Sequence, residues 1–376
     1  MDIKLSKEQE LLRDGLTKFL STRYDLEKSR AAAKTGAGWQ PDIWRAFADE
    51  LGILGATLPE TVGGIGGGPV ELMVITEALG HALVVEPYVD TVVVAGGLLE
   101  RAGGEQAASL LEKVVSGTAL VALAAGEAES GDRWQDVATT AERADDGWIL
   151  NGRKTVAMSA PLATHLLITA KTPAGLSLFL VDLESAGSGL SLTGYRTIDD
   201  RRAADMVLDG LRLPAGALLG EDGQAWPSLD TARDQGATAI CSEAVGCMRK
   251  VLADTVEYSK QRQQFGVPIG SFQVLAHRMV DMHIELEQAS AAVLLAVLHL
   301  TDDAVVRARS VSAAKATVGR AARFIGQQAV QLHGGMGMTE ELAIGHYFKR
   351  LTAMQYEFGT TDHHIGRYAA LSAPKG

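Results

Sequence analysis

The sequence predicts a multidomain α+β protein in which a helical domain, a β domain and a second helical domain follow one another. Apolar residues recur at helical spacing up to about residue 116. Short runs of β-branched and apolar residues, separated by turn residues, occupy positions 117–224. Long stretches of helical periodicity return over 225–376. The chain has 376 residues, 47% of them apolar, which is enough for two or three domains with their own cores.

The N-terminal domain, residues 1–116, is expected to be helical throughout. Leu12, Leu16 and Leu20 recur at helical spacing, and Pro41 stands near the start of another helix. A glycine-rich loop over 59–69 and the pair Gly103-Gly104 separate the helical segments.

The middle domain, residues 117–224, is expected to be a small β-barrel or sandwich. Its strand-like runs are ALVALAAG, GWILNG, THLLITAK, LSLFLVDL and ADMVLDGLRL. The pair Asn151-Gly152 after the run WIL is typical of a hairpin turn. The C-terminal domain, residues 225–376, contains a long periodic stretch over 237–262 and two more over 272–301 and 303–332. Long apolar-striped helices with short links predict a four-helix bundle.

Charge and composition exclude several classes of protein. The net charge of −11 and the isoelectric point near 5.3 argue against nucleic acid and anionic membrane surfaces as partners. The N-terminus lacks the apolar core of a signal peptide, and no apolar run is long enough to span a membrane. Cys241 and Cys247 would face different sides of one helix, so no disulfide is expected, which fits a cytoplasmic location. No metal site is expected, because His363 and His364 are adjacent and the remaining Cys and His residues lack ligand spacing.

An ordered set of local motifs runs along the chain. In sequence order they are LGILG (51–55) with LPE (58–60), EALG (77–80), LNGRK (150–154), RQQFGVPI (262–269) with FQ (272–273), and QLHGGMGMT (331–339). This set resembles the acyl-CoA dehydrogenase family over the whole length. The resemblance implies the fold of that family, with an N-terminal helical domain, a middle β-barrel domain and a C-terminal four-helix bundle. It also implies FAD as cofactor, α,β-dehydrogenation of an acyl-CoA thioester, and electron transfer flavoprotein as electron acceptor.

In the family, FAD spans a subunit interface: one middle domain holds the ring, and the neighbour's C-terminal bundle holds the adenine and pyrophosphate. The resemblance assigns the second role to five residues, Arg262, Phe265, Gln331, Gly334 and Gly335. A guanidinium offers a forked donor to pyrophosphate, and glycines let a backbone approach phosphate closely. Alternatively, the glycines only end a helix and Arg262 pairs with a surface carboxylate. The presence of both motifs in order favours the first interpretation.

Other positions depart from the family. The flavin loop of the family reads T-E-P-x-x-G-S-D, whereas this chain has AAGEAESGD at 124–132. Val156 and Met158 stand where the family has a tryptophan over the flavin and a threonine that bonds its ring. The position of the catalytic glutamate falls on Phe358 or Gly359, and the position that some members use instead falls on Gly236.

Two glutamates remain as candidate bases. Glu357 is adjacent to the lost position but is expected to point elsewhere. Glu243 lies two helical turns after Gly236, in the apolar run ICSEAVG, where a raised pKa would suit a general base. The alternative interpretation, which we favour, is that Glu243 pairs with a buried arginine or lines a pocket without chemistry.

By resemblance, the motifs that this chain retains bind the adenine and pyrophosphate end of a neighbouring subunit's FAD. The motifs that it lacks bind the flavin ring and remove the substrate proton. The sequence therefore suggests the non-catalytic subunit of a heteromeric acyl-CoA dehydrogenase, similar to the two-plus-two tetramers of bacterial steroid and sterol side-chain degradation. A homologous subunit would supply the ring pocket and the base, and a bulky acyl-CoA would be the substrate. Two alternatives stay open: a self-sufficient homotetramer that uses Glu243 or Glu357 as base, and a scaffold or CoA-ester-binding relative without catalysis.

Overall fold

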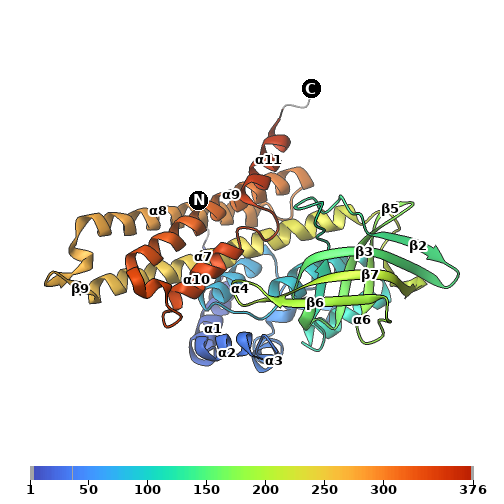
Figure 1. Cartoon of the computed structure of the whole chain (residues 1–376), viewed down its shortest axis with the longest axis horizontal. Coiled ribbons are helices and arrows are strands. Elements are labelled where there is room, and N and C mark those ends of the chain that lie inside the picture. The colour runs from blue at the N-terminus through green and yellow to red at the C-terminus, as the bar shows by residue number, and fades with distance from the viewer. Residues whose placement is uncertain (1–3, 36, 374–376) are drawn as a thin grey trace. The chain divides into compact units, whose positions relative to one another are not determined.

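A computed structural model describes residues 4–35 and 37–373 of the chain (Figure 1). Its packing divides into two compact units. The first unit comprises the chain up to Lys28, the segment Pro69–Val84, and everything from Ala237 onward. The second comprises Ser29–Gly68 and Val85–Gly236. Helices α2 (Leu26–Lys34) and α7 (Trp226–Gln261) pass from one unit to the other.

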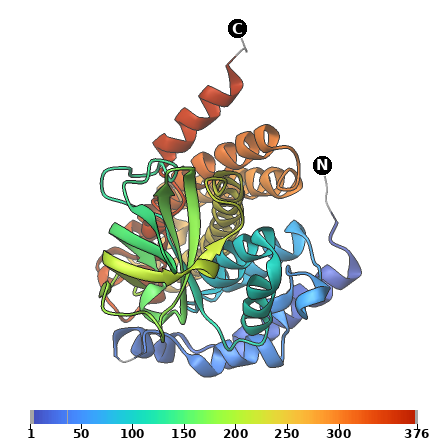
Figure 2. The same ribbon diagram turned by 90° about the vertical axis from the view of Figure 1, so that its right-hand side faces the viewer.

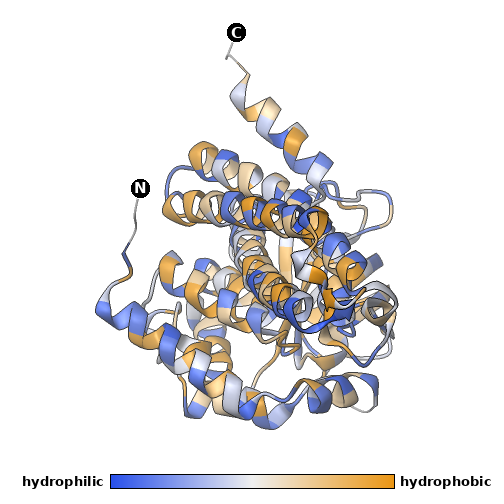
Figure 3. Ribbon diagram, turned by 90° about the vertical axis from the view of Figure 1, so that its left-hand side faces the viewer, coloured by the Kyte–Doolittle hydropathy of each residue, from blue (hydrophilic) through white to orange (hydrophobic). Residues whose placement is uncertain are grey.

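The first unit is helical. In addition to the second part of α7 it contains α1 (Lys7–Arg23), α4 (Pro69–His81), the short hairpin β9 (Gln263–Gln264) and β10 (Val267–Pro268), the 3₁₀ turn η6 (Ile269–Ser271), α8 (Gln273–Leu298), α9 (Ala304–His333), the 3₁₀ turn η7 (Gly334–Met338), α10 (Ala343–Ala353) and α11 (Thr361–Ser372). Helices α8, α10 and α11 all pack on α9, and α8 and α9 run side by side in Figure 1. Figure 3 shows hydrophobic and hydrophilic faces along these helices, which is the pattern of a bundle.

Sequence signals set the helix ends in this unit. Helix α1 begins with a capping box, in which the Ser6 hydroxyl accepts from the Gln9 amide and the Gln9 side chain accepts from the Ser6 amide. Asp303 caps α9 in a similar way by accepting from two backbone amides, and Gly334 ends the helix with a φ of 60°. Glycine also allows α4 and α7 to cross closely, because a Cβ at Gly246 would lie 1.9 Å from the Glu77 carbonyl oxygen.

The second unit joins short helices to a sheet. Its helical elements are α3 (Pro41–Asp49), the 3₁₀ turns η1 (Ile53–Gly55) and η2 (Glu60–Val62), the π-helix η3 (Val89–Ala95), α5 (Gly96–Ala102), α6 (Gly104–Val115), and the 3₁₀ turns η4 (Ala160–Leu162) and η5 (Ala215–Ala217). Its strands are β1 (Val121–Ala124), β2 (Thr140–Ala144), β3 (Gly147–Met158), β4 (His165–Thr172), β5 (Gly175–Asp182), β6 (Leu190–Arg196), β7 (Arg202–Pro214) and β8 (Leu218–Leu219).

The strands form one mixed sheet of eight strands. Their order is β6-β7-β3-β2-β4-β5-β8, and β1 pairs with β4 in parallel. Figure 2 looks onto this sheet and shows its strong twist. The sheet packs its apolar side chains, among them Trp148 and Phe179 with ring centroids 5.2 Å apart, into the core of the unit.

Two details of the sequence prediction for this domain need correction. The sheet is open rather than a closed barrel over the described residues, because β6 and β8, which stand at the two ends of the strand order, do not pair with each other. The Asn151-Gly152 pair is no hairpin turn, because β3 continues through it and pairs with β7 across a bulge. The hairpin turn between β2 and β3 lies at Asp145-Asp146, which precede Gly147.

Over residues 4–35 and 37–373, none of the helices is long and apolar enough to cross a membrane. Cys241 and Cys247 are both buried and free, and burial raises the pKa of the Cys241 thiol to about 12.

Candidate functional site

The segment after α7 forms a tight hairpin whose turn holds an aromatic residue in an unfavourable conformation. Strands β9 and β10 are joined by Phe265 and Gly266, with φ angles of 54° and 80°. Left-handed backbone at both central residues is the geometry of a two-residue type I′ turn. Glycine adopts it freely, but phenylalanine is strained there. The Phe265 side chain is 93% exposed, and its ring meets only the edge of Phe272 at 6.1 Å among the ring contacts of the described residues.

Arg262 stands at the base of this hairpin. Its backbone is fixed, since its amide donates to the Tyr258 carbonyl at 2.8 Å and its carbonyl accepts from Ile269 at 2.8 Å. Its side chain is exposed. The guanidinium forms no hydrogen bond or ion pair within the part of the chain that the structure describes, so the surface carboxylate considered from the sequence is not found. A fixed backbone and an uncommitted guanidinium leave a forked donor for an anion.

The second motif lies at the C-terminal end of α9. Gln331 is exposed, and so are Gly334 and Gly335. The Gly334 amide caps α9 by donating to the Gln331 carbonyl, so this N–H is not available to phosphate as expected from the sequence. A φ of 60° and ψ of −141° explain the glycine at 334. The structure thus supports both interpretations of Gly334-Gly335: the pair ends a helix, and it leaves an open backbone surface.

The two motifs are neighbours in the first unit. Tyr258, one turn before Arg262, stacks on His333, which directly precedes Gly334, with ring centroids 4.3 Å apart. His333 is buried, and its Nδ1–H donates to the Ala329 carbonyl at 2.8 Å. Residues about 70 positions apart in the sequence are therefore held on one side of the unit by a stacked pair of rings.

Both candidate bases bind the same arginine. Arg350 Nε and Nη2 donate to the two carboxylate oxygens of Glu243 at 2.9 and 3.1 Å. Arg350 Nη1 and Nη2 donate to the two oxygens of Glu357, the second at 3.3 Å. The Arg350 side chain is 2% exposed, and Glu357 is 15% exposed. Glu243 is buried. We call these three side chains the arginine clamp.

The clamp explains how a carboxylate is tolerated in the apolar run around Glu243. A buried charge is stable only when it is paired and its hydrogen-bonding capacity is met. Arg350 meets both needs, with a forked donor for each glutamate. Both oxygens of each glutamate are bound to the guanidinium, so Glu243 has the buried arginine partner that the sequence analysis favoured.

The loop at the position that the resemblance gives to the family's base is held by hydrogen bonds from α9 and α11. Phe358 and Gly359 have φ angles of 56° and 109°. Lys315 Nζ, on α9, donates to the carbonyls of Met354 and Gly359, each at 2.9 Å. The His364 Nε2–H donates to the Phe358 carbonyl at 3.0 Å. Burial lowers the pKa of His364 to about 3, so the imidazole is neutral.

Gly359 has no room for a side chain. A Cβ there would lie 2.9 Å from the imidazole rings of His363 and His364, in addition to the strain of its positive φ. Gly236, the other possible base position, is buried in α7. Both positions therefore lack a carboxylate, and one of them excludes it sterically.

The flavin-ring positions lie on β3 in the second unit. Val156 has a φ of 50° and is 57% exposed. It sits in a bulge, where its amide donates to Asp205 Oδ1 at 3.0 Å, and the same oxygen accepts from the Tyr195 hydroxyl at 2.9 Å. Met158 ends the strand. The family supplies an aromatic face and a hydroxyl donor at these two positions, and aliphatic and thioether groups supply neither.

The start of the flavin loop keeps a buried anchor. Glu127 Oε1 accepts from Lys154 Nζ at 2.7 Å and from the Thr139 hydroxyl at 2.6 Å, and Glu127 Oε2 accepts from the Ala138 amide at 2.6 Å. Burial opposes ionisation of Glu127, but the bonds from Lys154 and Thr139 outweigh it and lower its pKa. Burial also lowers the pKa of Lys154, to about 8. Glu127, Lys154 and Thr139 therefore fix the start of this loop on the sheet.

Sequence reasoning did not identify Arg350, Lys315 or Lys154, which hold these loops. One signal was available for Arg350, which lies between Tyr347 and Leu351 on the apolar face of α10 and is itself buried. A basic residue on an apolar face predicts a buried acidic partner. Over residues 4–35 and 37–373 no group of three or more His, Cys, Asp or Glu side chains has the geometry of a metal site.

The fold and the motifs define a three-domain protein of the class that dehydrogenates acyl-CoA thioesters with a flavin. Comparison with known families agrees. Models of the N-terminal, middle and C-terminal domains of acyl-CoA dehydrogenase match residues 6–118, 122–210 and 223–371. The chain therefore belongs to the acyl-CoA dehydrogenase family, whose members are FAD-dependent oxidoreductases.

Individual relatives match most of the length of the chain. Acyl-CoA dehydrogenase FadE12 of Mycobacterium tuberculosis is 30% identical over 359 residues, covering 90% of this chain and 89% of the relative. A variant of the Tcur3481–Tcur3483 steroid ACAD is 29% identical, with a TM-score of 0.88 and 97% of both chains covered. The ChsE4–ChsE5 complex of Mycobacterium tuberculosis contains a chain 26% identical to this one, with a TM-score of 0.88 and 100% of both chains covered.

The residues of this chain fit FAD unequally. The uncommitted guanidinium of Arg262 and the exposed ring of Phe265 fit the pyrophosphate and adenine end. Val156 and Met158 offer the flavin ring neither stacking nor a side-chain hydrogen bond from a hydroxyl. The fit is therefore good for one end of the cofactor and poor for the other.

Proposed function

We propose that this chain is the non-catalytic subunit of a heteromeric acyl-CoA dehydrogenase and completes the FAD site of a homologous catalytic subunit. The arginine clamp is the observation that carries the proposal. Each candidate base, Glu243 and Glu357, has both carboxylate oxygens bound to Arg350. A general base must be positioned at the α-proton of the substrate, whereas the bonds from Arg350 tie both oxygens of each carboxylate to the protein.

The resemblance assigns two motifs, RQQFGVPI (262–269) and QLHGGMGMT (331–339), to the adenine and pyrophosphate end of FAD, and we call them the FAD-tail motifs. Their exposed residues support the same role. Arg262 and Phe265 project from the first unit without partners that would explain them within the chain. A strained, exposed aromatic residue is costly unless something else uses it. In the heteromer, Arg262 would hold the pyrophosphate, Phe265 would pack near the adenine, and Gln331 with the Gly334-Gly335 backbone would lie along the same end of FAD.

The surface of α8 supports a partner chain. Val280, Ile284, Leu295 and Leu298 are all at least 40% exposed. Their spacing places them on one face of α8, with Glu287 between the two pairs, and exposed apolar residues on one helix face are typical of a helix that packs against another subunit. Two of the solved relatives are described as pairs of different chains, Tcur3481–Tcur3483 and ChsE4–ChsE5.

The substrate and the electron acceptor follow from the proposed assembly. The description of one relative as a steroid ACAD suggests a bulky polycyclic acyl-CoA for the heteromer. FAD bound to the partner would accept the hydride from the β-carbon, and electron transfer flavoprotein would reoxidise it. This chain's own residues would bind and orient the cofactor tail, while the partner would hold the ring and remove the α-proton.

The test measures FAD content by flavin absorbance, for this chain alone and for this chain co-purified with a homologue that carries the Trp-x-Thr segment and a glutamate base. We expect a colourless lone chain and one FAD per two chains in the pair. Arg262→Ala should remove most of the FAD from the pair. Lys260→Ala is the matched control, because Lys260 is an exposed cation of the same helix end that pairs with Glu257 at 3.6 Å.

Turnover of the pair separates the remaining possibilities. Glu243→Gln and Glu357→Gln should each leave the turnover of a correctly folded pair within about twofold, whereas removal of the partner's glutamate should abolish it. One FAD per chain in the lone protein, together with loss of turnover in either glutamate variant, would instead show a self-sufficient enzyme. Absence of FAD from every preparation would show a scaffold.

A further inference from the structure

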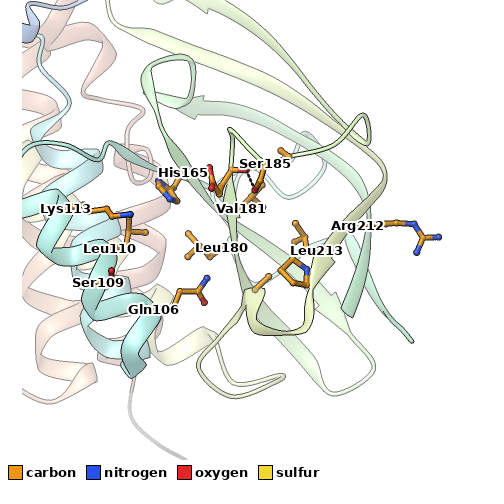
Figure 4. A pocket seen from close by; sticks show the side chains of 14 residues that line it. Gln106, Ser109, Leu110, Lys113, His165, Leu180, Val181, Ser185, Arg212 and Leu213 are labelled. Atoms are coloured by element: carbon orange, nitrogen blue, oxygen red, sulfur yellow. Dashed lines mark hydrogen bonds between the residues drawn. The ribbon is translucent and has the colours of Figure 1, made fainter. Parts of the chain in front are cut away.

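A cavity of about 380 Å³ lies in the second unit, between α6 and the strands β4, β5 and β7 (Figure 4). Its floor is apolar and includes Leu110 of α6, Leu180 of β5 and Leu213 of β7, all of them buried. At about 30 Å³ for each water-sized atom, the cavity has room for roughly a dozen non-hydrogen atoms. That size is at the lower end of the range for small-molecule sites.

Polar groups of α6 border the same cavity. Gln106, Ser109 and Lys113 follow one another at helical spacing, so they share one face of the helix. In the part of the chain that the structure describes, their side chains make no hydrogen bond or ion pair. In Figure 4 the Lys113 amine extends toward His165 of β4, whereas the Arg212 side chain points away from the cavity.

His165 has one ring nitrogen committed and one free. The Thr164 hydroxyl lies 2.8 Å from His165 Nδ1 and 3.0 Å from the Leu120 carbonyl, so Nδ1 is hydrogen-bonded to Thr164. No hydrogen bond reaches His165 Nε2 from the described residues. When the imidazole is protonated, Nε2–H becomes a second cationic donor beside Lys113.

We propose that this cavity is a binding site for a small amphipathic carboxylate, whose apolar part lies on Leu110, Leu180 and Leu213 and whose carboxylate is held by Lys113 and His165. The site does not depend on the FAD-tail motifs or on the arginine clamp, and it therefore goes beyond the proposed dehydrogenase role. Lys113 and His165 both line the cavity beside its apolar residues, and two nitrogen donors favour a carboxylate over a neutral ligand; the Asp182 carboxylate also lies in the lining.

The proposal includes a direction for the effect of pH. The charged groups that face His165 are Lys113 of α6 and Asp182, its strand partner on β5. Burial lowers the pKa of His165, and Lys113 adds to the lowering while Asp182 opposes it. A bound carboxylate would favour the protonated imidazole, so binding should tighten as the pH falls below the ordinary histidine value of about 6.5 and should level off above it.

Calorimetric titration of the purified protein with octanoate, in the presence of its partner if the two co-purify, tests the proposal. We expect one saturable site per copy of this chain, weakened about tenfold by Lys113→Met through loss of the charged bond. Ser109→Trp, at an exposed position, should fill the cavity and abolish binding. Arg212→Met is the matched control and should bind as the unmodified protein does, because its guanidinium lies outside the cavity.

Three results would overturn the proposal. One is no saturable binding of octanoate at millimolar concentration. Another is binding that Lys113→Met and Ser109→Trp leave unchanged, which would place the ligand elsewhere. The third is equal affinity for 1-octanol, because a site that recognises the carboxylate must discriminate against the neutral alcohol. Circular dichroism spectra of each variant show whether it is folded.

Discussion

Replacing Arg350 by methionine tests the arginine clamp directly. The change would leave Glu243 buried without its cation, and the 2.9 and 3.1 Å bonds to its oxygens would be lost. Breaking a buried ion pair by removing one partner costs about 3–5 kcal/mol, because the remaining charge stays desolvated. Glu357 is 15% exposed and can turn to water, so its release adds little. We therefore expect the free energy of unfolding to fall by about 3–5 kcal/mol.

Urea unfolding followed by circular dichroism measures this loss, with two comparison variants. Arg249→Met removes an arginine that pairs with Glu77 at 2.6 Å on the surface, where such a pair contributes about 1 kcal/mol or less. Arg350→Met combined with Glu243→Met removes both buried charges and should recover most of the stability. The reasoning is refuted if Arg350→Met costs less than about 1 kcal/mol, or if the double variant is less stable than the single one.

Three further predictions follow from other contacts. Acidification from pH 7 to pH 4.5 should lower the free energy of unfolding by roughly 2–3 kcal/mol through His364, because the pKa of this histidine is about 3 in the folded chain and 6.5 in the unfolded chain. In urea unfolding measured against pH, His364→Gln should flatten the curve over this range. A curve unchanged by the substitution would contradict the prediction. Phe265→Gly should stabilise the lone chain by about 1 kcal/mol, seen as a higher Tm, because glycine is not strained at this positive φ. The same change should lower the FAD content of the pair, and unaltered FAD content would argue against the role assigned to Phe265. Gly246→Ala should lower the free energy of unfolding in urea by roughly 2–3 kcal/mol, because the new Cβ would meet the Glu77 carbonyl. Gly366→Ala is the control and should not destabilise the chain, because Gly366 has open space around it. Equal effects of the two substitutions would disprove the steric argument.

Local signals in the sequence predicted the helical parts well. The predicted helix over 303–332 is observed as α9, Ala304–His333, because Asp303 caps its start and Gly334 ends it. The β domain was less predictable. Asn151-Gly152 is a strong local turn signal, but the pairing of β3 with β7, more than 50 residues later, keeps the strand continuous through it.

The candidate site shows the same limit. The exposed motifs around Arg262 and Gly334 could be identified from the sequence because their residues are close together in the chain. The clamp could not, since Glu243 and Arg350 are 107 residues apart and only the packing of α7 and α10 brings them together. A charged residue within an apolar run indicates that an oppositely charged partner is needed. The spacing of residues in the sequence does not identify which residue that partner is.

The loop at Gly359 makes the missing glutamate difficult to restore. A single codon change to glutamate would place a side chain 2.9 Å from two imidazoles, on a backbone with a φ of 109°. The loop is also tied by Lys315 and His364, so several residues would have to change together before a carboxylate could be accommodated. In the proposed heteromer, the filling of this space by His363 and His364 would make dependence on a partner's base hard to reverse.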